Sequence, residues 1–431
     1  MDRDGNKALY LPTLQEEFFA SLKRSSGSVP RRYEFPEGKN QIKVAIGMRR
    51  SGKTYFLFQT IRNLLASGVP KEKILYLNLE DDRLLPMDQK TLGSMIDAWY
   101  TLDPSRHRHC CYLFLDEIQN IDGWPLVLRR ILDTKEIQIY ITGSSAKLLA
   151  KEIASSLRGR SLAIEILPFN YLEYLDAHQY EAPSKSMGRS ALDHQRSYLL
   201  EYFQTGGFPG IQFIPPNEQL ETLQNYVETV IFRDIIERYQ IVNVNLLKYF
   251  ILSLLKNTSS LFSIHKFVND VKSQGYKLGK DTLYNYLTYI EDAFLVFTVP
   301  LFTESLRQSQ ITAKKIYAID PGLAGANTFH LSEDLGKCFE NMIYLDLRRQ
   351  GKKVFYYRTA EGHEIDFVTQ DIRGKYELIQ VAWEITDLQT RDREEKALRE
   401  AERQLGISGR IIDWQTYLSE WSDLSKIDFL I

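Results

Sequence analysis

Between residues 41 and 168 the chain alternates between short apolar runs and amphipathic stretches. Branched and aromatic residues typical of buried strands fill five runs: QIKVAIG, KILYLNL, CYLFLDE, IQIYITG and SLAIEILP. Helical spacing follows them in four stretches: SGKTYFLFQTIRNLLASG, MDQKTLGSMIDAWYTL, PLVLRRILDTK and AKLLAKEIASSLRGR. Strands that alternate with helices predict an α/β fold, in which a parallel sheet carries helices on both faces.

The pattern changes after Pro168. Helical spacing then dominates five stretches: YLLEYFQTGGFPGI, YVETVIFRDIIERYQI, LLKYFILSLLKN, SIHKFVNDVKSQG and KDTLYNYLTYIEDAF. The last three precede the apolar run LVFTVPLF, and three helices closed by a strand are the outline of a winged helix. From Lys314 onward strands and helices mix again, which predicts a C-terminal α/β domain.

These changes divide the chain into five predicted segments. They are an N-terminal helix and lead-in (1–40), a parallel α/β core (41–195), a helical lid or linker (196–244), a winged helix (245–305) and a C-terminal domain (306–431). A chain of 431 residues is long enough for several domains of ordinary size.

Composition narrows the class of protein. The formal net charge is -2, whereas a protein coated with nucleic acid along its length is usually basic, so any such contact must be local. The three cysteines form no CxxC pair, which suits a reducing compartment. The longest apolar runs are far shorter than a membrane span, and we see no signal peptide, so we expect a cytoplasmic protein.

The segment GMRRSGKT, residues 47–54, matches the phosphate-binding pattern GxxxxGK[ST] and lies between a predicted strand and a predicted helix. Gly47 and Gly52 let backbone N–H groups curl around phosphate oxygens, and the following helix presents its positive end. Lys53 is expected to reach the β- and γ-phosphates, and Thr54 to hold Mg²⁺ through its hydroxyl. The predicted nucleotide contacts are Gly47, Arg50, Ser51, Gly52, Lys53 and Thr54.

Two acids end the third predicted strand, CYLFLDE. Asp116 is expected to hold Mg²⁺, and Glu117 to orient and polarise an attacking water. Acids often end strands because strand ends are wet, so one acid would be weak support. Two acids on the third strand after a phosphate loop favour hydrolysis of a nucleoside triphosphate.

The next strand ends in ITGSS, which places Thr142, Ser144 and Ser145 near the predicted γ-phosphate. Any of them is a candidate sensor of that phosphate or of the attacking water. The alternative is a Gly/Ser turn needed only for its geometry. Both interpretations stay open at this point.

Arg158 and Arg160 end the helix predicted after this strand. A cation from either side chain is a candidate finger that neutralises charge on the γ-phosphate, in the same chain or in a neighbouring subunit. The alternative is that the two arginines stabilise the C-terminus of their helix through its dipole.

The order of these parts resembles an AAA+ ATPase of the archaeal and origin-recognition-like branch. The resemblance narrows to a family of poorly characterised prokaryotic ATPases through six segments: GMRRSGKT, YLNLEDDRL, LFLDEIQN, ITGSSAKLL, LRGR and LPFNYLEYL. Four more resemble the C-terminal domain of unknown function that accompanies it: RDIIERYQI, YAIDPGL, GKCFENMIYLDL and YYRTAEGHEIDFV. Membership implies ATP binding and hydrolysis. The choice of ATP over GTP rests on this resemblance alone.

The C-terminal domain resembles a winged helix joined to a PD-(D/E)xK nuclease-like fold. Such a nuclease needs acids around Mg²⁺ and a lysine that assists the water. Glu340, Glu364 and Asp366 fill acidic places, but Gln380-Val381-Ala382 stands where the motif has Glu-x-Lys. Glu377 and Glu384 are candidate substitutes that bring no lysine. We therefore expect a retained fold without nuclease activity.

A winged helix is a candidate reader of DNA, and its recognition helix here would offer Lys280, Thr282 and Asn285. Nearby lysines are Lys266, Lys272 and Lys277, while acids on the same helix are Asp281, Glu291 and Asp292. Contact with an unknown protein partner is an equally open use of this domain.

The leading hypothesis is an Mg²⁺-dependent ATPase that drives a conformational switch. The alternatives are a nucleotide-gated binding protein with little hydrolysis and an ATP-regulated nuclease. A finger supplied by a second copy would require an oligomer.

Overall fold

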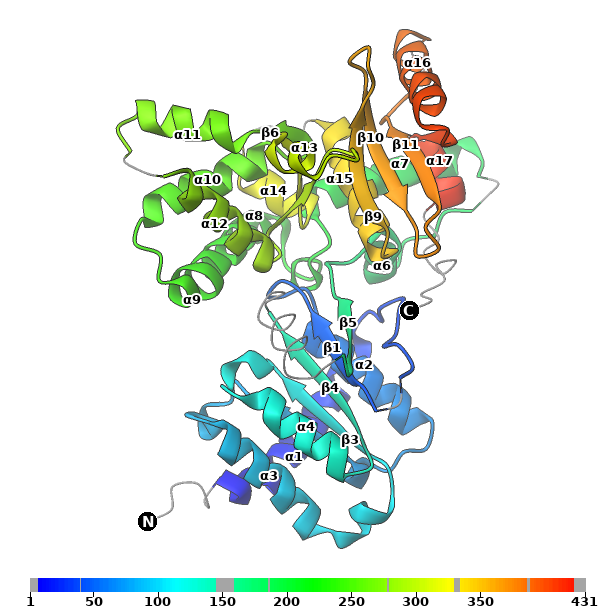
Figure 1. Cartoon of the computed structure of the whole chain (residues 1–431). Coiled ribbons are helices and arrows are strands. Elements are labelled where there is room, and N and C mark those ends of the chain that lie inside the picture. Colours follow the sequence, from blue (N-terminus) through cyan, green and yellow to red (C-terminus); the bar gives the residue numbers. More distant parts are fainter. Residues whose placement is uncertain are drawn as a thin grey trace. The chain divides into compact units, whose positions relative to one another are not determined.

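The structure is a computed structural model that describes residues 7–38, 40–144, 159–184, 187–276, 279–328, 334–385 and 388–421. The chain divides into two compact units, Met1–Ile166 and Leu167–Ile431. Figure 1 shows the elements of both units, which are described separately below.

A five-stranded sheet forms the centre of the first unit. Its strands are β1 (Ile42–Ile46), β2 (Ile74–Asn78), β3 (Cys111–Asp116), β4 (Ile137–Gly143) and β5 (Ser161–Glu165). They lie in the order β2-β3-β4-β1-β5, and all neighbouring pairs are parallel. The predicted parallel α/β fold is confirmed. The carboxyl ends of β1, β3 and β4 therefore meet at one edge of the sheet, where α/β proteins bind phosphates.

Helices cover both faces of this sheet. They are α1 (Leu11–Arg24), α2 (Lys53–Ala66), α3 (Gln89–Leu102) and α4 (Trp124–Thr134). Successive strand residues face opposite sides. Leu113 and Leu115 share a core with Trp99 of α3 and Leu128 of α4, whereas Phe114 packs into the other core. The helix predicted around residues 146–160 lies mostly outside the described residues.

The second unit begins with helices. They are α6 (Tyr171–His178), α7 (Arg189–Thr205) and α8 (Pro216–Thr229), and a π-helical segment (Val230–Ile236) continues into α9 (Glu237–Tyr239). Asn170 caps α6 with a capping box, in which its side chain accepts from the Glu173 N–H and the Glu173 carboxylate accepts from the Asn170 N–H. The sequence predicts helices throughout this stretch, and the structure confirms this prediction.

A small sheet with four helices follows. The elements are α10 (Val244–Lys256), β6 (Ser260–Phe262), α11 (Ile264–Ser273), α12 (Lys280–Asp292), β7 (Val296–Val299), α13 (Leu306–Ile311) and β8 (Lys314–Ala318). The strands lie in the order β6-β8-β7 and pair antiparallel.

A mixed sheet completes the second unit. Its elements are α14 (Pro321–Ala326), α15 (Leu335–Arg349), β9 (Lys353–Arg358), β10 (Glu364–Gln370), β11 (Tyr376–Val381), α16 (Leu388–Leu405), β12 (Gly409–Ile412), α17 (Trp414–Thr416) and a π-helical turn (Tyr417–Trp421). The order is β12-β11-β10-β9, with β12 parallel to β11 and the other pairs antiparallel. The predicted C-terminal α/β arrangement is confirmed.

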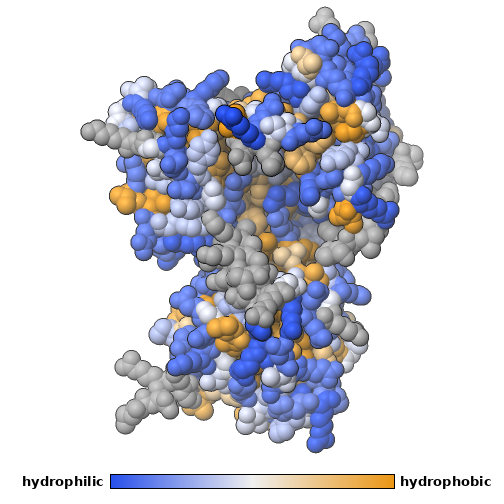
Figure 2. All heavy atoms as spheres, viewed as in Figure 1, coloured by the Kyte–Doolittle hydropathy of each residue, from blue (hydrophilic) through white to orange (hydrophobic). Residues whose placement is uncertain are grey.

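The face of the molecule in Figure 2 is mainly hydrophilic, and its apolar residues form separate small areas. Among the described residues, no helix combines the length and the apolar character that crossing a bilayer requires.

Candidate functional site

The phosphate-binding segment turns between β1 and α2, as the sequence predicts. A Cβ atom on Gly47 would stand 2.3 Å from the Ile166 carbonyl oxygen, so only glycine fits there. Gly52 caps α2 with φ 101°, a left-handed conformation that glycine adopts without strain. The hydroxyl of Ser51 is buried and has no hydrogen-bond partner among the described residues. A loop that curls around a helix N-terminus and leaves a buried hydroxyl unsatisfied fits a phosphate group.

Lys53 brings the positive charge of this site. Its side chain is 4% exposed, and its Nζ donates to the carbonyl oxygens of Gly47 and Met48, each at 3.2 Å. The same Nζ lies 3.6 Å from Oε1 of Glu117. The ammonium therefore stands between the phosphate loop and the end of β3, where it can neutralise phosphate oxygens.

Asp116 is a buried carboxylate surrounded by hydroxyl donors. The Thr54 hydroxyl donates to Oδ2 at 2.7 Å and the Tyr76 hydroxyl donates to the same atom at 2.9 Å. The Thr142 hydroxyl donates to Oδ1. Burial and the adjacent carboxylate of Glu117 raise the pKa of Asp116 above its usual value, and the three hydroxyls oppose this rise. A bound cation would favour the ionised carboxylate, so Asp116 with Thr54 fits a Mg²⁺ site.

Glu117 is held in an unusual backbone conformation, with φ 57° in the left-handed region. Its N–H donates to the Thr142 hydroxyl at 2.8 Å, and its carboxylate accepts from Nε2 of Gln119 at 2.6 Å. Burial alone would raise the pKa of Glu117, but the Lys53 ammonium and Gln119 bring it below its usual value. Glu117 is therefore ionised at neutral pH and can accept a hydrogen bond from a water molecule.

The candidate sensors lie at the end of β4, next to these acids. Thr142 is fully buried, and both its donor and its acceptor capacity serve Asp116 and Glu117. The structure thus gives Thr142 a positioning role toward the two acids. Ser144 is also buried and accepts from Gln119 at 3.4 Å. Ser145 lies outside the described residues.

The arginine candidates are not brought to this site in the described part of the chain. Arg158 lies outside the described residues. Arg160 precedes β5, its side chain is 51% exposed, and it pairs with Asp133. The Arg160 carbonyl accepts from the N–H of Ile42 at the start of β1, whereas the phosphate loop follows the end of β1. A five-residue strand rises about 13 Å, so Arg160 lies near the amino ends of the strands and the phosphate loop lies at their carboxyl ends.

Sequence reasoning missed two residues of the site. Tyr76 comes from β2, where the parallel register sets Asn78 beside Asp116 and so brings the phenol within reach of the carboxylate. Gln119 follows Glu117 by two residues and holds its carboxylate. The sequence did contain a local sign of Gln119, because a polar residue two positions after an acid pair can reach back to the second acid. Tyr76 could be found only from the register of β2 and β3, which lie far apart in the sequence.

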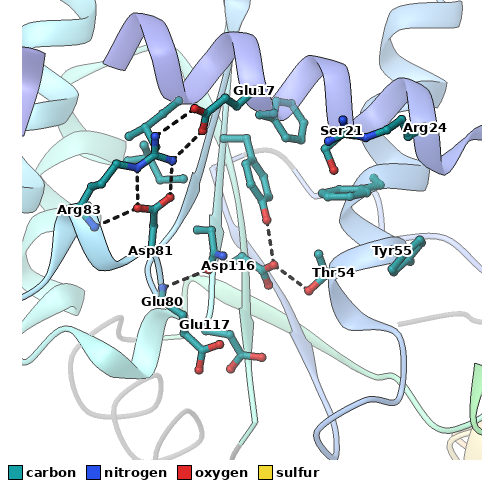
Figure 3. Close-up of a pocket in the computed structure, with 16 residues that line it drawn as sticks. Glu17, Ser21, Arg24, Thr54, Tyr55, Glu80, Asp81, Arg83, Asp116 and Glu117 are labelled. Atoms are coloured by element: carbon teal, nitrogen blue, oxygen red, sulfur yellow. Dashed lines mark hydrogen bonds and ion pairs between the residues drawn. The ribbon is translucent and has the colours of Figure 1, made fainter. Parts of the chain in front are cut away.

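A cavity of about 500 Å³ opens beside the acid pair. Its lining includes Thr54, Asp116 and Glu117, and in Figure 3 the side chains of Thr54 and Asp116 face each other, with Glu117 close by. Helix α1 lines the opposite wall with Glu17, Ser21 and Arg24. The volume lies in the range of ordinary ligand pockets.

The comparisons identify the first part of the chain. The family described as AAA domain matches residues 39–175, and two domains of unknown function, DUF8612 and DUF4143, match residues 196–333 and 335–417. The uncharacterized protein MJ1544 of Methanocaldococcus jannaschii is 35% identical over 396 residues, which cover 90% of this chain and 85% of that protein. The chain belongs to the same family as MJ1544, and its first unit carries an AAA domain.

Three further proteins are similar to this chain. An uncharacterized protein of Haemophilus influenzae is 28% identical over 347 residues, 80% of this chain and 83% of that protein. The structure of the Walker-type ATPase PABY2304 of Pyrococcus abyssi superposes on 70% of this chain, with 97% of its own chain matched. The TM-score is 0.42 and the sequence identity is 12%. The ORC1 protein of Aeropyrum pernix, solved in complex with DNA, covers 76% and 92%, with a TM-score of 0.29 and 13% identity.

The acids of the predicted nuclease-like site lie close together in the second unit. Glu340 of α15 and Glu364 and Asp366 of β10 all lie within 3.0 Å of one lysine nitrogen. Gln380 of β11 accepts from the Asp366 N–H at 3.2 Å and donates to Glu394 at 2.7 Å. Gln380 therefore acts as a hydrogen-bonding residue in the fold.

The candidate DNA-reading helix is α12. Lys280 and Asn285 are exposed on it, and Thr282 is partly buried. Its two C-terminal acids are engaged elsewhere in the fold. Glu291 accepts from the Thr298 hydroxyl at 2.6 Å, and Asp292 accepts from the Tyr239 hydroxyl at 3.1 Å. Asp281 is exposed at the first turn of α12, and Lys277 lies outside the described residues.

Proposed function

We propose that this protein binds ATP with Mg²⁺, hydrolyses it in a reducing cytoplasm, and uses the cycle to drive a conformational switch. One observation carries the proposal. The loop residues Lys53 and Thr54 contact the acids Glu117 and Asp116, so phosphate-binding, metal-binding and water-orienting groups stand in one site. Phosphoryl transfer depends mainly on such positioning and on neutralising charge.

Each residue has a chemical task in this proposal. The Lys53 ammonium neutralises the β- and γ-phosphates, and Thr54 and Asp116 hold the metal. Glu117 orients a water molecule toward the γ-phosphorus and accepts its proton, while the bond to the β–γ bridging oxygen breaks. Thr142 keeps both acids in place. Bound Mg²⁺ supplies positive charge to the phosphate oxygens.

The finger cation remains a prediction. Arg160 stands at the far edge of its own sheet, so we assign it to the site of a second copy of this chain. This assignment requires an oligomer, which mass measurement with and without ATP would test.

Equilibrium binding of a fluorescent ATP analogue in Mg²⁺ tests the nucleotide site. Lys53→Ala should weaken binding by about 100-fold, because a charge-assisted contact to phosphate is worth about 3 kcal/mol in a buried site. Lys71→Ala is the matched control, since Lys71 is an exposed lysine of the same unit that precedes β2. Equal affinity of the Lys53 and Lys71 variants would refute the site.

We propose DNA duplex as a second ligand, bound by the segment from α10 to β8. The helices α10, α11 and α12 with a three-stranded antiparallel sheet support a winged-helix interpretation. Lys280 of α12 and Lys266 of α11 are both exposed and available to phosphates. Binding measured by fluorescence anisotropy should weaken with salt and with Lys266→Ala/Lys280→Ala. Affinity that salt leaves unchanged would contradict this role.

A further inference from the structure

A single lysine lies at the centre of the acidic cluster in the second unit. Lys315 comes from β8, and its side chain is 2% exposed. Its Nζ lies 3.0 Å from Oε1 of Glu340, 2.9 Å from Oε1 of Glu364 and 2.8 Å from Oδ1 of Asp366. Three carboxylates from α15 and β10 therefore converge on one ammonium supplied by a strand of a different sheet.

The charges in this cluster keep Lys315 protonated. Burial alone would lower the pKa of Lys315, but Asp366 and Glu340 raise it well above its usual value. Burial raises the pKa of Glu340 to about 7, although Lys315 opposes the rise. The buried Tyr317 hydroxyl also donates to Oε1 of Glu340 at 2.6 Å. Three carboxyl groups thus share this ammonium, and only Glu364 has a second cation, Arg358, at 3.6 Å among the described ion pairs.

Several carboxylate oxygens around one centre are the ligand type that hard divalent cations prefer. Calcium takes such oxygens at about 2.3–2.6 Å, so the cluster would have to contract by about half an ångström to hold it. The ammonium already fills that centre, and the two cations cannot share it. Within the described residues, no group of three or more His, Cys, Asp or Glu side chains is arranged to hold a metal ion.

Backbone and side-chain groups of β11 also hold the cluster in place through hydrogen bonds. The second oxygen of Asp366 accepts from the Val381 N–H at 2.9 Å, and Gln380 is tied to Glu394. Ala382 follows on this strand and offers no amine. The Gln380 side chain and the Val381 N–H of β11 therefore hold Asp366 in place beside the ammonium.

We propose that the Lys315 ammonium occupies the position that a metal ion would otherwise take among Glu340, Glu364 and Asp366. In that position it excludes divalent cations. The lysine holds the sheet of β8 to α15 and β10 without a metal. Removal of this one charge should uncover a site for Ca²⁺ or Mn²⁺. The inference is independent of the proposed ATPase, because all the residues lie in the second unit.

The test is metal binding by the full-length protein without nucleotide, for wild type, Lys315→Met and Lys315→Met/Asp366→Asn. Methionine keeps the length of the side chain and removes the charge. Titration with Mn²⁺, followed by electron paramagnetic resonance, should show one additional bound ion in Lys315→Met. The double variant should return to the wild-type number, and so should the charge-preserving Lys315→Arg.

Thermal unfolding gives a second readout that covers poor folding of the variant. Without metal, Lys315→Met should unfold about 5 °C or more below wild type, because three carboxylates lose their shared cation. Millimolar Ca²⁺ should restore much of this loss in Lys315→Met and leave wild type unchanged. A folded Lys315→Met that gains no ion, or one that stays unfolded in Ca²⁺, would overturn the proposal.

A nuclease assay of the wild-type protein is the third measurement. If Lys315 excludes metals, wild type should not cleave DNA or RNA in Mg²⁺. Cleavage by wild type that is lost in both Lys315→Met and Asp366→Ala would make Lys315 part of a working nuclease site and would also overturn the proposal.

Discussion

At the residue scale, the Thr142 hydroxyl links the two acids that end β3. It accepts from the Glu117 N–H at 2.8 Å and donates to the Asp116 carboxylate. The left-handed backbone of Glu117 is a conformation that costs about 1–3 kcal/mol and persists only where surrounding contacts hold it. A single buried hydroxyl thus orients both the metal-binding acid and the water-orienting acid.

Thr142→Val should therefore slow hydrolysis while nucleotide affinity changes little. Valine fills the same volume, but the N–H of Glu117 and one oxygen of Asp116 lose their partner. We expect kcat to fall by about 10-fold to 100-fold, since misplacing a general base forfeits part of a factor of about 10²–10⁴. Thr142→Ser, which keeps the hydroxyl, should retain most of the rate. A valine variant with wild-type kcat would show that the hydroxyl has no such role.

At the element scale, the aspartates that cap α14 and α15 in the second unit differ in burial. Asp320 caps α14 by accepting from the Leu323 N–H at 2.8 Å, and it also accepts from the Gly207 N–H at 2.6 Å. It is 1% exposed and joins α14 to the loop after α7. Asp334 caps α15 through the Lys337 N–H, but it lies at the surface.

The two caps should differ in their effect on stability. Asp320→Ala leaves two buried N–H groups without a partner and should destabilise the second unit by about 2–4 kcal/mol. Asp334→Ala should cost only about 1 kcal/mol, because water replaces the lost acceptor. Thermal unfolding of the two variants measures the difference. Equal losses would contradict the importance of the buried cap.

Much of this arrangement of elements was predictable from the sequence. Apolar runs that alternate with amphipathic helices gave the parallel sheet, and the loop at residues 47–54 fixed which edge binds phosphate. The partners of the site required tertiary structure. Tyr76 reaches Asp116 only through the pairing of β2 with β3, and Lys315 meets Asp366 only because two separate sheets pack together. No local pattern encodes such contacts.

At the scale of the whole molecule, the first unit ends beside the phosphate loop. The N–H of Ile166, the last residue of that unit, donates to the Ile46 carbonyl at 2.7 Å, and Gly47 follows Ile46. The Ile166 carbonyl also lies against Gly47. We therefore predict that nucleotide binding at the loop stabilises the hydrogen bonds of the segment that leads into the second unit.

Hydrogen exchange should detect this connection. In a Glu117→Gln variant held with ATP and Mg²⁺, amides at residues 164–167 should exchange more slowly than without nucleotide, because an ordered loop stabilises their hydrogen bonds. Amides of β12 in the second unit serve as the internal reference. Unchanged exchange at residues 164–167, with ATP bound, would argue against this route for the switch.

The central claim is that the acid pair of β3 makes this site a working ATPase. Steady-state ATP hydrolysis by wild type and Glu117→Gln, with and without DNA, tests it most directly. We predict Mg²⁺-dependent turnover that falls by about 100-fold or more in Glu117→Gln while ATP binding persists. Hydrolysis by Glu117→Gln at the wild-type rate, or no turnover by wild type that binds ATP tightly, would contradict the account.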